Sequence, residues 1–264
     1  MKKLLIIIVF LPTLCFGWGA EGHRIIGAIA DQHLTDVTRS KMNKMMKQSL
    51  SDVSNWMDEM RDQWGGANTF HYISMPVDAL RYEPNAHCAN EGICALSMIE
   101  RHTRRLKDVT ESPGSHGESI KIITHLVEDL HMPLHTGGQK DDYGGNAVKV
   151  DFFGKRSNLH KIFDTNIIVH ANKSEEQWIA DLTKDLTPEK IRAIQAGDIY
   201  DWIDDSHKDV LSLYENLPKK KGGEIIITEE YVAFGTKIIE EQMLEAGLRL
   251  AKYLNDTMAK VVIR

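Results

Sequence analysis

The chain has 264 residues and a formal net charge of −6, with 42% hydrophobic and 27% charged residues. This length and composition suit a globular protein with one large core, and nothing in them requires a second domain. The acidic balance excludes a protein that holds a polyanion by a broad basic face, so any positive charge that meets phosphate must be local.

The first 17 residues have the layout of a signal peptide. Two lysines precede an unbroken apolar run over residues 4–10, and small residues stand one and three positions before Trp18. We predict cleavage after Gly17, which leaves 247 of the 264 residues and takes the formal charge from −6 to −8 because both lysines leave. An uncleaved anchor and lipidation at Cys15 are the alternatives; the apolar run is well short of the ~20 residues that a membrane span needs. The processed protein is expected to be secreted or periplasmic, monomeric and without stable membrane association.

Apolar periodicity predicts a mostly helical chain. A repeat near 3.6 residues indicates three helices, over residues 24–34, 118–131 and 228–260. Pro133 should end the second helix, and Gly235 or Gly247 is where the third would break.

One strand signal stands out among the helices. Residues 148–153 alternate like a strand, which Gly154 would turn into a short hairpin, and residues 137–145 form a polar, glycine-rich loop. The expectation is a single mainly α domain over residues 18–264, with several packed helices and a short β-hairpin.

Two cysteines, Cys88 and Cys94, remain after cleavage. An even count in an exported chain suggests a disulfide, which would contribute about 2 kcal/mol because the loop is short. A zinc site built on these thiols is less favoured, since the processed chain has no further cysteine.

Histidine and aspartate recur at the spacing i, i+4, in His125 with Asp129 and in His160 with Asp164. On a helix both side chains of such a pair share one face, and a buried carboxylate there is costly unless it is paired or bound to a metal. A structural ion pair explains a single pair at least as well as a metal ligand pair does.

Further candidate ligands surround these pairs: His135 follows just past the proline, and Asp58 and His71 lie upstream. Histidine and carboxylate are the ligands of catalytic zinc, whereas structural zinc sites are rich in cysteine. Several sets in one chain favour a multinuclear site. A metal-free helical domain with salt bridges is the alternative.

The predicted new N-terminus adds another candidate ligand. Cleavage would expose Trp18, followed by Gly19, Gly22 and His23. A free α-amine has a pKa near ~8, so a metal can bind its deprotonated form, and the amine and carbonyl of one residue form a five-membered chelate. Otherwise Trp18 is a core aromatic at the start of a helix.

The order of these motifs is specific. The chain carries Trp-Gly-x-x-Gly-His, Trp-x-Asp with a nearby Arg, His-Tyr-Ile, His-x-x-x-Asp followed by Pro-Leu-His, Gly-Gly-Asn, and Asn-Leu-His-x-x-x-Asp-Thr. This order resembles the family of zinc-dependent single-strand-specific nucleases and 3′-nucleotidases, from Trp18 to about Asp164 and again, weakly, in the C-terminal helix. The resemblance implies a phospholipase C/nuclease-type fold.

The resemblance also implies three Zn²⁺ ions with nine ligand residues. One ion resembles the site of Asp58, His71, His125 and Asp129. A second would be held by the Trp18 amine and carbonyl, His23 and Asp129, which therefore bridges. The third would be held by His135, His160 and Asp164.

Substrate contacts follow from the same resemblance. Arg61 would bind phosphoryl oxygens and Asn146 would donate to phosphate; a surface arginine beside Asp62 and a turn residue are the plain alternatives. Tyr72 and Tyr143 would stack on a base from opposite sides, or are simply half-buried tyrosines. Ser74 replaces an Asp that contacts the base edge in matching family members, so base preference is not carried over.

The implied function is a secreted zinc-dependent phosphodiesterase. It would hydrolyse single-stranded DNA and RNA to 5′-phosphate products, and act as a 3′-nucleotidase, through attack of metal-activated hydroxide on phosphorus at the Asp58 and Asp129 centre. Zinc phospholipase C is the alternative within the same fold; the short gap from Trp18 to His23 and the Asp at position 164 favour the nuclease. A zinc-binding or storage protein without turnover is a further alternative.

Overall fold

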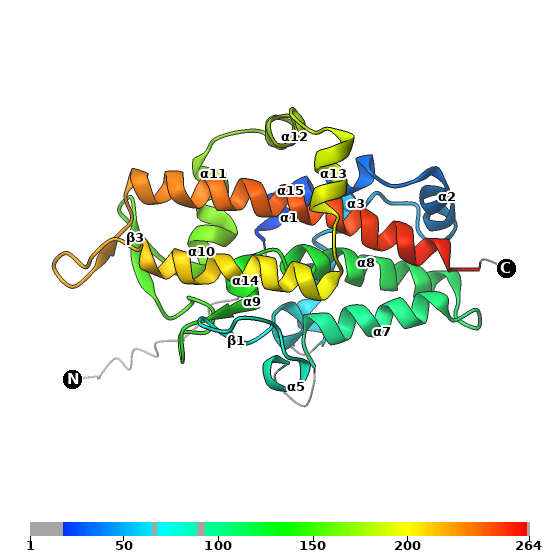
Figure 1. Cartoon of the computed structure of the whole chain (residues 1–264), viewed down its shortest axis with the longest axis horizontal. Helices are drawn as coiled ribbons and strands as arrows, with labels where there is room; N and C mark the ends of the chain where they lie inside the picture. The colour runs from blue at the N-terminus through cyan, green and yellow to red at the C-terminus, as the bar shows by residue number, and fades with distance from the viewer. Residues whose placement is uncertain (1–17, 65–67, 89–92, 263–264) are drawn as a thin grey trace, which may run out of the picture.

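A computed structural model describes residues 18–64, 68–88 and 93–262. The predicted signal peptide and its cleavage site lie outside or at the edge of the described residues. Most of the described chain is helical (Figure 1). The elements up to the first half of the chain are α1 (Ala20–Gln32), α2 (Asp36–Met45), α3 (Leu50–Val53), α4 (Trp56–Glu59), η1 (Arg61–Trp64), η2 (Asn68–His71), β1 (Met75–Pro76), α5 (Pro84–His87), α7 (Ala95–Lys107) and α8 (Pro113–Asp129).

The second half continues with short elements and then long helices. These are α9 (Pro133–Thr136), β2 (Gly137–Gly138), β3 (Lys149–Phe152), β4 (Lys155–Asn158), α10 (Leu159–Lys161), η3 (Ile162–Asn166), α11 (Ile167–His170), α12 (Glu175–Thr183), α13 (Pro188–Ile194), α14 (Ile199–Glu215), β5 (Ile225–Ile226) and α15 (Glu229–Ala259). No helix of these described segments is long and apolar enough to cross a membrane.

Helix α15 runs unbroken along the middle of the molecule and packs on α1, α8 and α14 (Figure 1). Neither glycine that was a candidate break interrupts it. At Gly247 an added Cβ would lie 2.6 Å from Ile29 Cγ2 and 3.1 Å from the Ile26 carbonyl. The glycine therefore serves the close approach of α15 to α1.

Two of the predicted helices begin earlier in the chain than their apolar periodicity indicates. Helix α8 begins at Pro113 because Ser112 caps it, accepting from the Ser115 amide at 3.1 Å, and proline suits the first turn. Helix α1 begins at Ala20, directly after the glycine that follows Trp18. Periodicity alone misses such turns, because capping residues and small residues carry no apolar signal.

The predicted hairpin is confirmed. Strands β3 and β4 pair antiparallel in the register Val150↔Ser157, and Gly154 turns between them with φ +82°. The parallel pairing of β3 with β5 was not predicted. A second parallel pair joins Met75 of β1 to Gly137 of β2, so segments far apart in sequence share one short ladder.

The core has two parts on either side of the central helices. One gathers apolar side chains of α2, α7, α8 and the C-terminal half of α15. The other gathers those of α1, η3, α14 and the N-terminal half of α15. Trp18 and Trp178 are among the largest fully buried side chains of the second part.

Candidate metal centre

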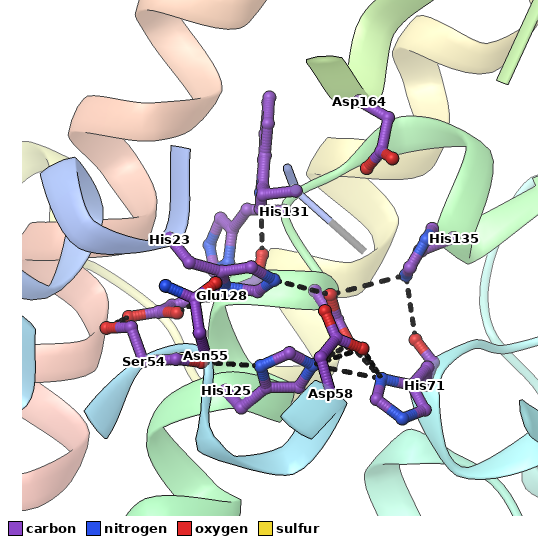
Figure 2. Close-up of polar contacts among 12 residues, drawn as sticks. His23, Ser54, Asn55, Asp58, His71, His125, Glu128, His131, His135 and Asp164 are labelled. Carbon is purple, nitrogen blue, oxygen red and sulfur yellow. Dashed lines mark hydrogen bonds and ion pairs between the residues drawn. The ribbon is translucent and has the colours of Figure 1, made fainter. Parts of the chain in front are cut away.

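Helix α8 supplies two fully buried candidate ligands, His125 and Asp129, which are both 0% exposed. Their i, i+4 spacing places His125 Nε2 3.2 Å from Asp129 Oδ2. His71, at the end of η2, brings its Nδ1 to 3.0 Å from the same oxygen. Figure 2 shows how the labelled histidines His23, His71 and His135 approach this helix from separate elements.

Asp58 reaches the same place from α4. Its Oδ1 lies 3.9 Å from both His71 Nδ1 and His125 Nε2. Asp58, His71 and His125 each offer one ligand atom within 4.8 Å of the others, so the group could hold a metal ion. Arg61 donates from Nη2 to Asp58 Oδ1 at 2.7 Å and is 5% exposed, so the interpretation of Arg61 as a surface residue is wrong.

A second group consists of His23, His125 and Asp129. His23 Nε2 lies 3.6 Å from Asp129 Oδ1, and the His23 ring stacks on the His125 ring at 4.2 Å. The two side-chain oxygens of Asp129 thus face two different groups.

Trp18 lies beside this second group, fully buried. Its indole Nε1 donates to the Glu128 carbonyl at 2.9 Å, and the next amide, Gly19 N, donates to the Asp164 carbonyl at 2.7 Å. Trp18 is thus a buried core aromatic, in agreement with the simpler of the two interpretations. Its ligation of a metal stays a prediction.

The third group, His135, His160 and Asp164, matches the predicted set. His135 Nδ1 donates to the His71 carbonyl and His160 Nδ1 to the Gly144 carbonyl, both at 2.8 Å. These bonds turn the two Nε2 atoms toward each other, 3.3 Å apart. Asp164 lies on η3, a π-helical turn, a type of turn that is often found at functional sites.

The electrostatics of the cluster fit a bound cation. Burial would lower the pKa of His125, but Asp129 and Asp58 raise it to about 10. Burial raises the pKa of Asp164 well above its usual value, and Asp129 and Asp58 add to that shift. The carboxylates therefore concentrate negative charge in a buried space, and a bound metal ion would neutralise that charge.

Several buried polar atoms point the same way. His23 Nε2, Asp129 Oδ1 and Asp164 Oδ1 have no hydrogen-bond partner within the described chain. Leaving such atoms unsatisfied is costly, whereas metal ions in the second and third groups would use them as ligands. No other histidine of the described residues belongs to one of the three groups. His131, two residues past the end of α8, donates instead to the Val127 carbonyl at 2.8 Å.

The cluster opens onto a cavity of about 1090 Å³. The candidate ligands His71, His135 and His160 line it. Of the residues expected to contact substrate, Arg61 is not among the lining residues, and the others are: Tyr72, Ser74, Tyr143 and Asn146. Tyr143 is 79% exposed, so it is no half-buried tyrosine. Asn146 donates to the Tyr143 carbonyl at 2.9 Å and so also serves the turn.

A carboxylate that sequence reasoning missed holds the loop carrying Tyr143. Asp142 is 7% exposed; its Oδ2 accepts from the Tyr214 hydroxyl at 2.5 Å and its Oδ1 from the Gly145 amide at 3.2 Å. The glycine-rich composition indicated a loop but gave no sign of its anchor, because the partner lies on α14.

The disulfide between Cys88 and Cys94 is confirmed, with an S–S distance of 2.18 Å. A zinc site on these thiols is therefore wrong. The residues that flank the disulfide contact the cavity lining: the Ser74 amide donates to the His87 carbonyl at 2.9 Å, and the Ala95 amide donates to the Tyr72 carbonyl at 3.3 Å.

A helical fold that gathers imidazoles and carboxylates from distant elements on the floor of a cavity is typical of metal-dependent hydrolases. The chain belongs to the S1/P1 nuclease family, whose profile matches residues 18–259. It is 27% identical over 267 residues to Endonuclease 2 of Arabidopsis thaliana, covering 90% of each chain. It is 27% identical to Nuclease S1 of Aspergillus oryzae, with 93% of each covered, and 26% identical to Nuclease P1 of Penicillium citrinum, with 90% of this chain and 97% of that one covered.

The family and the mainly α fold expected from the sequence are thereby confirmed. The protein is a nuclease, a hydrolase that acts on nucleic acid, and its His/Asp groups could hold metal ions. Membership favours the nuclease over the phospholipase C alternative.

Proposed function

We propose that the protein is a secreted or periplasmic, monomeric zinc-dependent phosphodiesterase that cleaves single-stranded DNA and RNA to 5′-phosphate products and removes phosphate from 3′-nucleotides. The observation that carries the proposal is the set of three buried His/Asp groups beside one cavity. We assign them three Zn²⁺ ions, with Trp18 of the processed chain completing the second group and Asp129 shared between two.

Zinc in such groups would lower the pKa of a coordinated water to about 7 and neutralise charge that develops on phosphate. The chain's own residues supply the rest. Asp129 offers one oxygen to each of two groups, and Arg61 orients Asp58 while it presents a guanidinium suited to phosphoryl oxygens. Asn146 is proposed to donate a hydrogen bond to the same phosphate.

Selectivity for single strands would follow from the position of the cluster. The ligands are nearly or fully buried, so a nucleotide must leave its stack to reach them, which is costly in a duplex. Tyr72 and Tyr143 both line the cavity and offer flat faces on which any base can stack, at roughly 1–3 kcal/mol each.

The test uses the processed protein, with its N-terminal residue identified by sequencing and its zinc content measured. Incubation with a 3′-mononucleotide and with single-stranded DNA should release phosphate and 5′-phosphorylated products. Turnover of neither substrate together with clear turnover of phosphatidylcholine would favour a phospholipase C. Zinc binding without any turnover would favour a storage protein.

An added N-terminal residue tests the role of Trp18 separately. A protein that begins one residue before Trp18 lacks the amine at the position of the chelate, so we expect it to bind fewer zinc ions than the processed protein. An undiminished metal count in the extended protein would remove Trp18 from the ligand set.

A further inference from the structure

Glu128 is a fully buried carboxylate that belongs to no metal-ligand group among the described residues. It adjoins the candidate ligand Asp129 on α8, but it is not among the residues that line the cavity. Its side chain instead contacts His23 of α1 and Ser54, which lies between α3 and α4 (Figure 2). A buried carboxylate needs partners to offset its lost hydration. Both of its oxygens have one.

The first partner is His23. Glu128 Oε2 lies 2.6 Å from His23 Nδ1, and His23 Nε2 faces Asp129 Oδ1. A cation can bind Nε2 only when that nitrogen carries a lone pair, so the proton of the neutral ring must sit on Nδ1. There Glu128 accepts it. A carboxylate behind a ligand histidine fixes both the tautomer and the ring orientation.

The second partner is Ser54. Its hydroxyl lies 2.9 Å from Glu128 Oε1 and 2.8 Å from the Leu50 carbonyl, two acceptors that share its single proton. Its own carbonyl accepts from His125 Nδ1 at 2.6 Å. Ser54 therefore supports both stacked histidines. It contacts His23 through Glu128, and its carbonyl accepts directly from His125.

The backbone around this contact allows the close approach. Gly27 lies one turn after His23 on α1, and a Cβ there would come within 2.8 Å of Ser51 Cα and Ser51 N. Helix α1 can thus lie against α3 with Ser54 between it and α8. The Trp18 indole donates to the Glu128 carbonyl at 2.9 Å and so contacts the same turn of α8.

We infer that Glu128 and Ser54 form a positioning unit, here called the Glu128–Ser54 support, which sets the tautomer and orientation of His23 and so determines the affinity of the second group for its metal ion. The inference rests on the proposed metal centre. It adds two residues that touch neither metal nor substrate.

The substitution Glu128→Gln tests the support with little change of volume. A glutamine amide can meet His23 Nδ1 either with its oxygen or, flipped, with its NH₂ group, and the flipped form pushes the ring proton to Nε2, where it blocks the metal. Loss of an outer partner of a ligand histidine lowers metal affinity by about 10–100-fold. We expect a loss of that size for one zinc ion, with the other two retained.

Two readouts separate this effect from a general loss of structure. The zinc retained by the processed protein is measured against a graded concentration of chelator, and the ¹⁵N shifts of the imidazoles report which ring nitrogen of His23 carries the proton. Glu118→Gln is the matched control, since Glu118 lies on the same helix but pairs with Arg105 at the surface. Its zinc retention should equal that of the unmodified protein.

Ser54→Ala is the second variant, in case Glu128→Gln does not fold. It removes the hydroxyl at Glu128 but leaves the carbonyl at His125, so zinc should weaken in the same group by a smaller factor. Unchanged zinc affinity and an unchanged His23 tautomer in both variants would overturn the inference alone. An unmodified protein that holds no zinc would overturn the proposed metal centre as well.

Discussion

At the scale of single residues, Asp129 contributes more than any other side chain to the arrangement of the cluster. Its Oδ2 approaches His71 and His125, while its Oδ1 approaches His23 at 3.6 Å and His135 at 3.5 Å. Burial would raise the pKa of Asp129, but His125 and His135 hold it well below the usual value. The carboxylate therefore stays ionised: its Oδ2 accepts a hydrogen bond from His71, while its Oδ1 has no hydrogen-bond partner among the described residues.

Asp129→Asn should remove zinc and activity together. The amide keeps the shape but offers one oxygen and no charge, so neither group that shares the residue retains its ligand set. We expect kcat/KM on single-stranded DNA to fall by more than about 100-fold, beyond what loss of an outer partner costs. Zinc analysis of the same sample checks the link; full activity in this variant would end the bridging role.

The residues of the three His/Asp groups could be singled out as candidate ligands from the sequence, because their chemistry and spacing recur in an ordered series of motifs. Their supports could not. Glu128 reads as one more acid on an amphipathic helix, and Ser54 as an ordinary small residue. Their roles depend on α1, α3 and α8 lying together, which no spacing within one segment encodes.

At the scale of elements, α7 and α8 pack closely and enclose His102. Its Nδ1 lies 3.1 Å from Ser119 Oγ. Burial, followed by the nearby charges of Arg105 and Arg101, lowers the pKa of His102 to about 4. The histidine is neutral in the folded protein at neutral pH.

This pairing of helices predicts a stability that depends on pH. The unfolded chain takes up the His102 proton near pH 6.5 and the folded chain only near pH 4, so the unfolded state binds more protons between these values. The contribution of His102 is present above about pH 6.5 and is lost as the pH falls toward 4. As the pH falls from about 6.5 to 4, the free energy of unfolding of His102→Gln, measured with urea, should therefore decrease by less than that of the unmodified protein. Equal decreases in the two proteins would contradict this role of His102.

The loop between β2 and β3 is anchored to α14 through the Tyr214 hydroxyl, which donates to Asp142 and accepts from the Gln139 amide. Tyr214→Phe removes the hydroxyl that donates to Asp142 and leaves a buried carboxylate oxygen without that partner. Such a loss costs about 1–3 kcal/mol. Because the same loop supplies the Gly144 carbonyl to His160, kcat/KM should fall along with the free energy of unfolding.

Tyr200→Phe is a suitable control for that measurement. Tyr200 also donates to an acid, Glu100, but at an exposed site on α14. We expect little change in either quantity. Equal behaviour of the two variants would show that the Tyr214 contact has no special role.

At the scale of the whole molecule, the predicted ligands span residues 18 to 164 and come from elements that the two core parts hold together. The mainly α architecture and the hairpin followed from periodicity. The two parallel strand pairs did not, because pairs of two residues carry no alternation and join segments far apart in sequence.

Metal removal should destabilise the whole fold. Without a cation, three buried atoms of the candidate ligands have no hydrogen-bond partner among the described residues: Asp129 Oδ1, Asp164 Oδ1 and His23 Nε2. A ligand at about 1,000 times its Kd stabilises a protein by about 4 kcal/mol per site. The Tm of the chelated protein should be clearly lower and should recover on adding Zn²⁺ but not Mg²⁺; equal Tm values with and without zinc would argue against a structural role for the ions.

The short ladder between β1 and β2 has a mechanical consequence. The Ile73 amide donates to the His135 carbonyl at 2.7 Å, while His135 Nδ1 donates back to the His71 carbonyl. These two hydrogen bonds hold the segments of His71 and His135 together where they line the cavity. Another part of the cavity lining, which includes the exposed Tyr143, belongs to the glycine-rich loop over residues 137–145. Asp142 anchors this loop through its hydrogen bond with Tyr214. We therefore expect any widening of the cavity to involve the loop of residues 137–145 rather than the segments of His71 and His135.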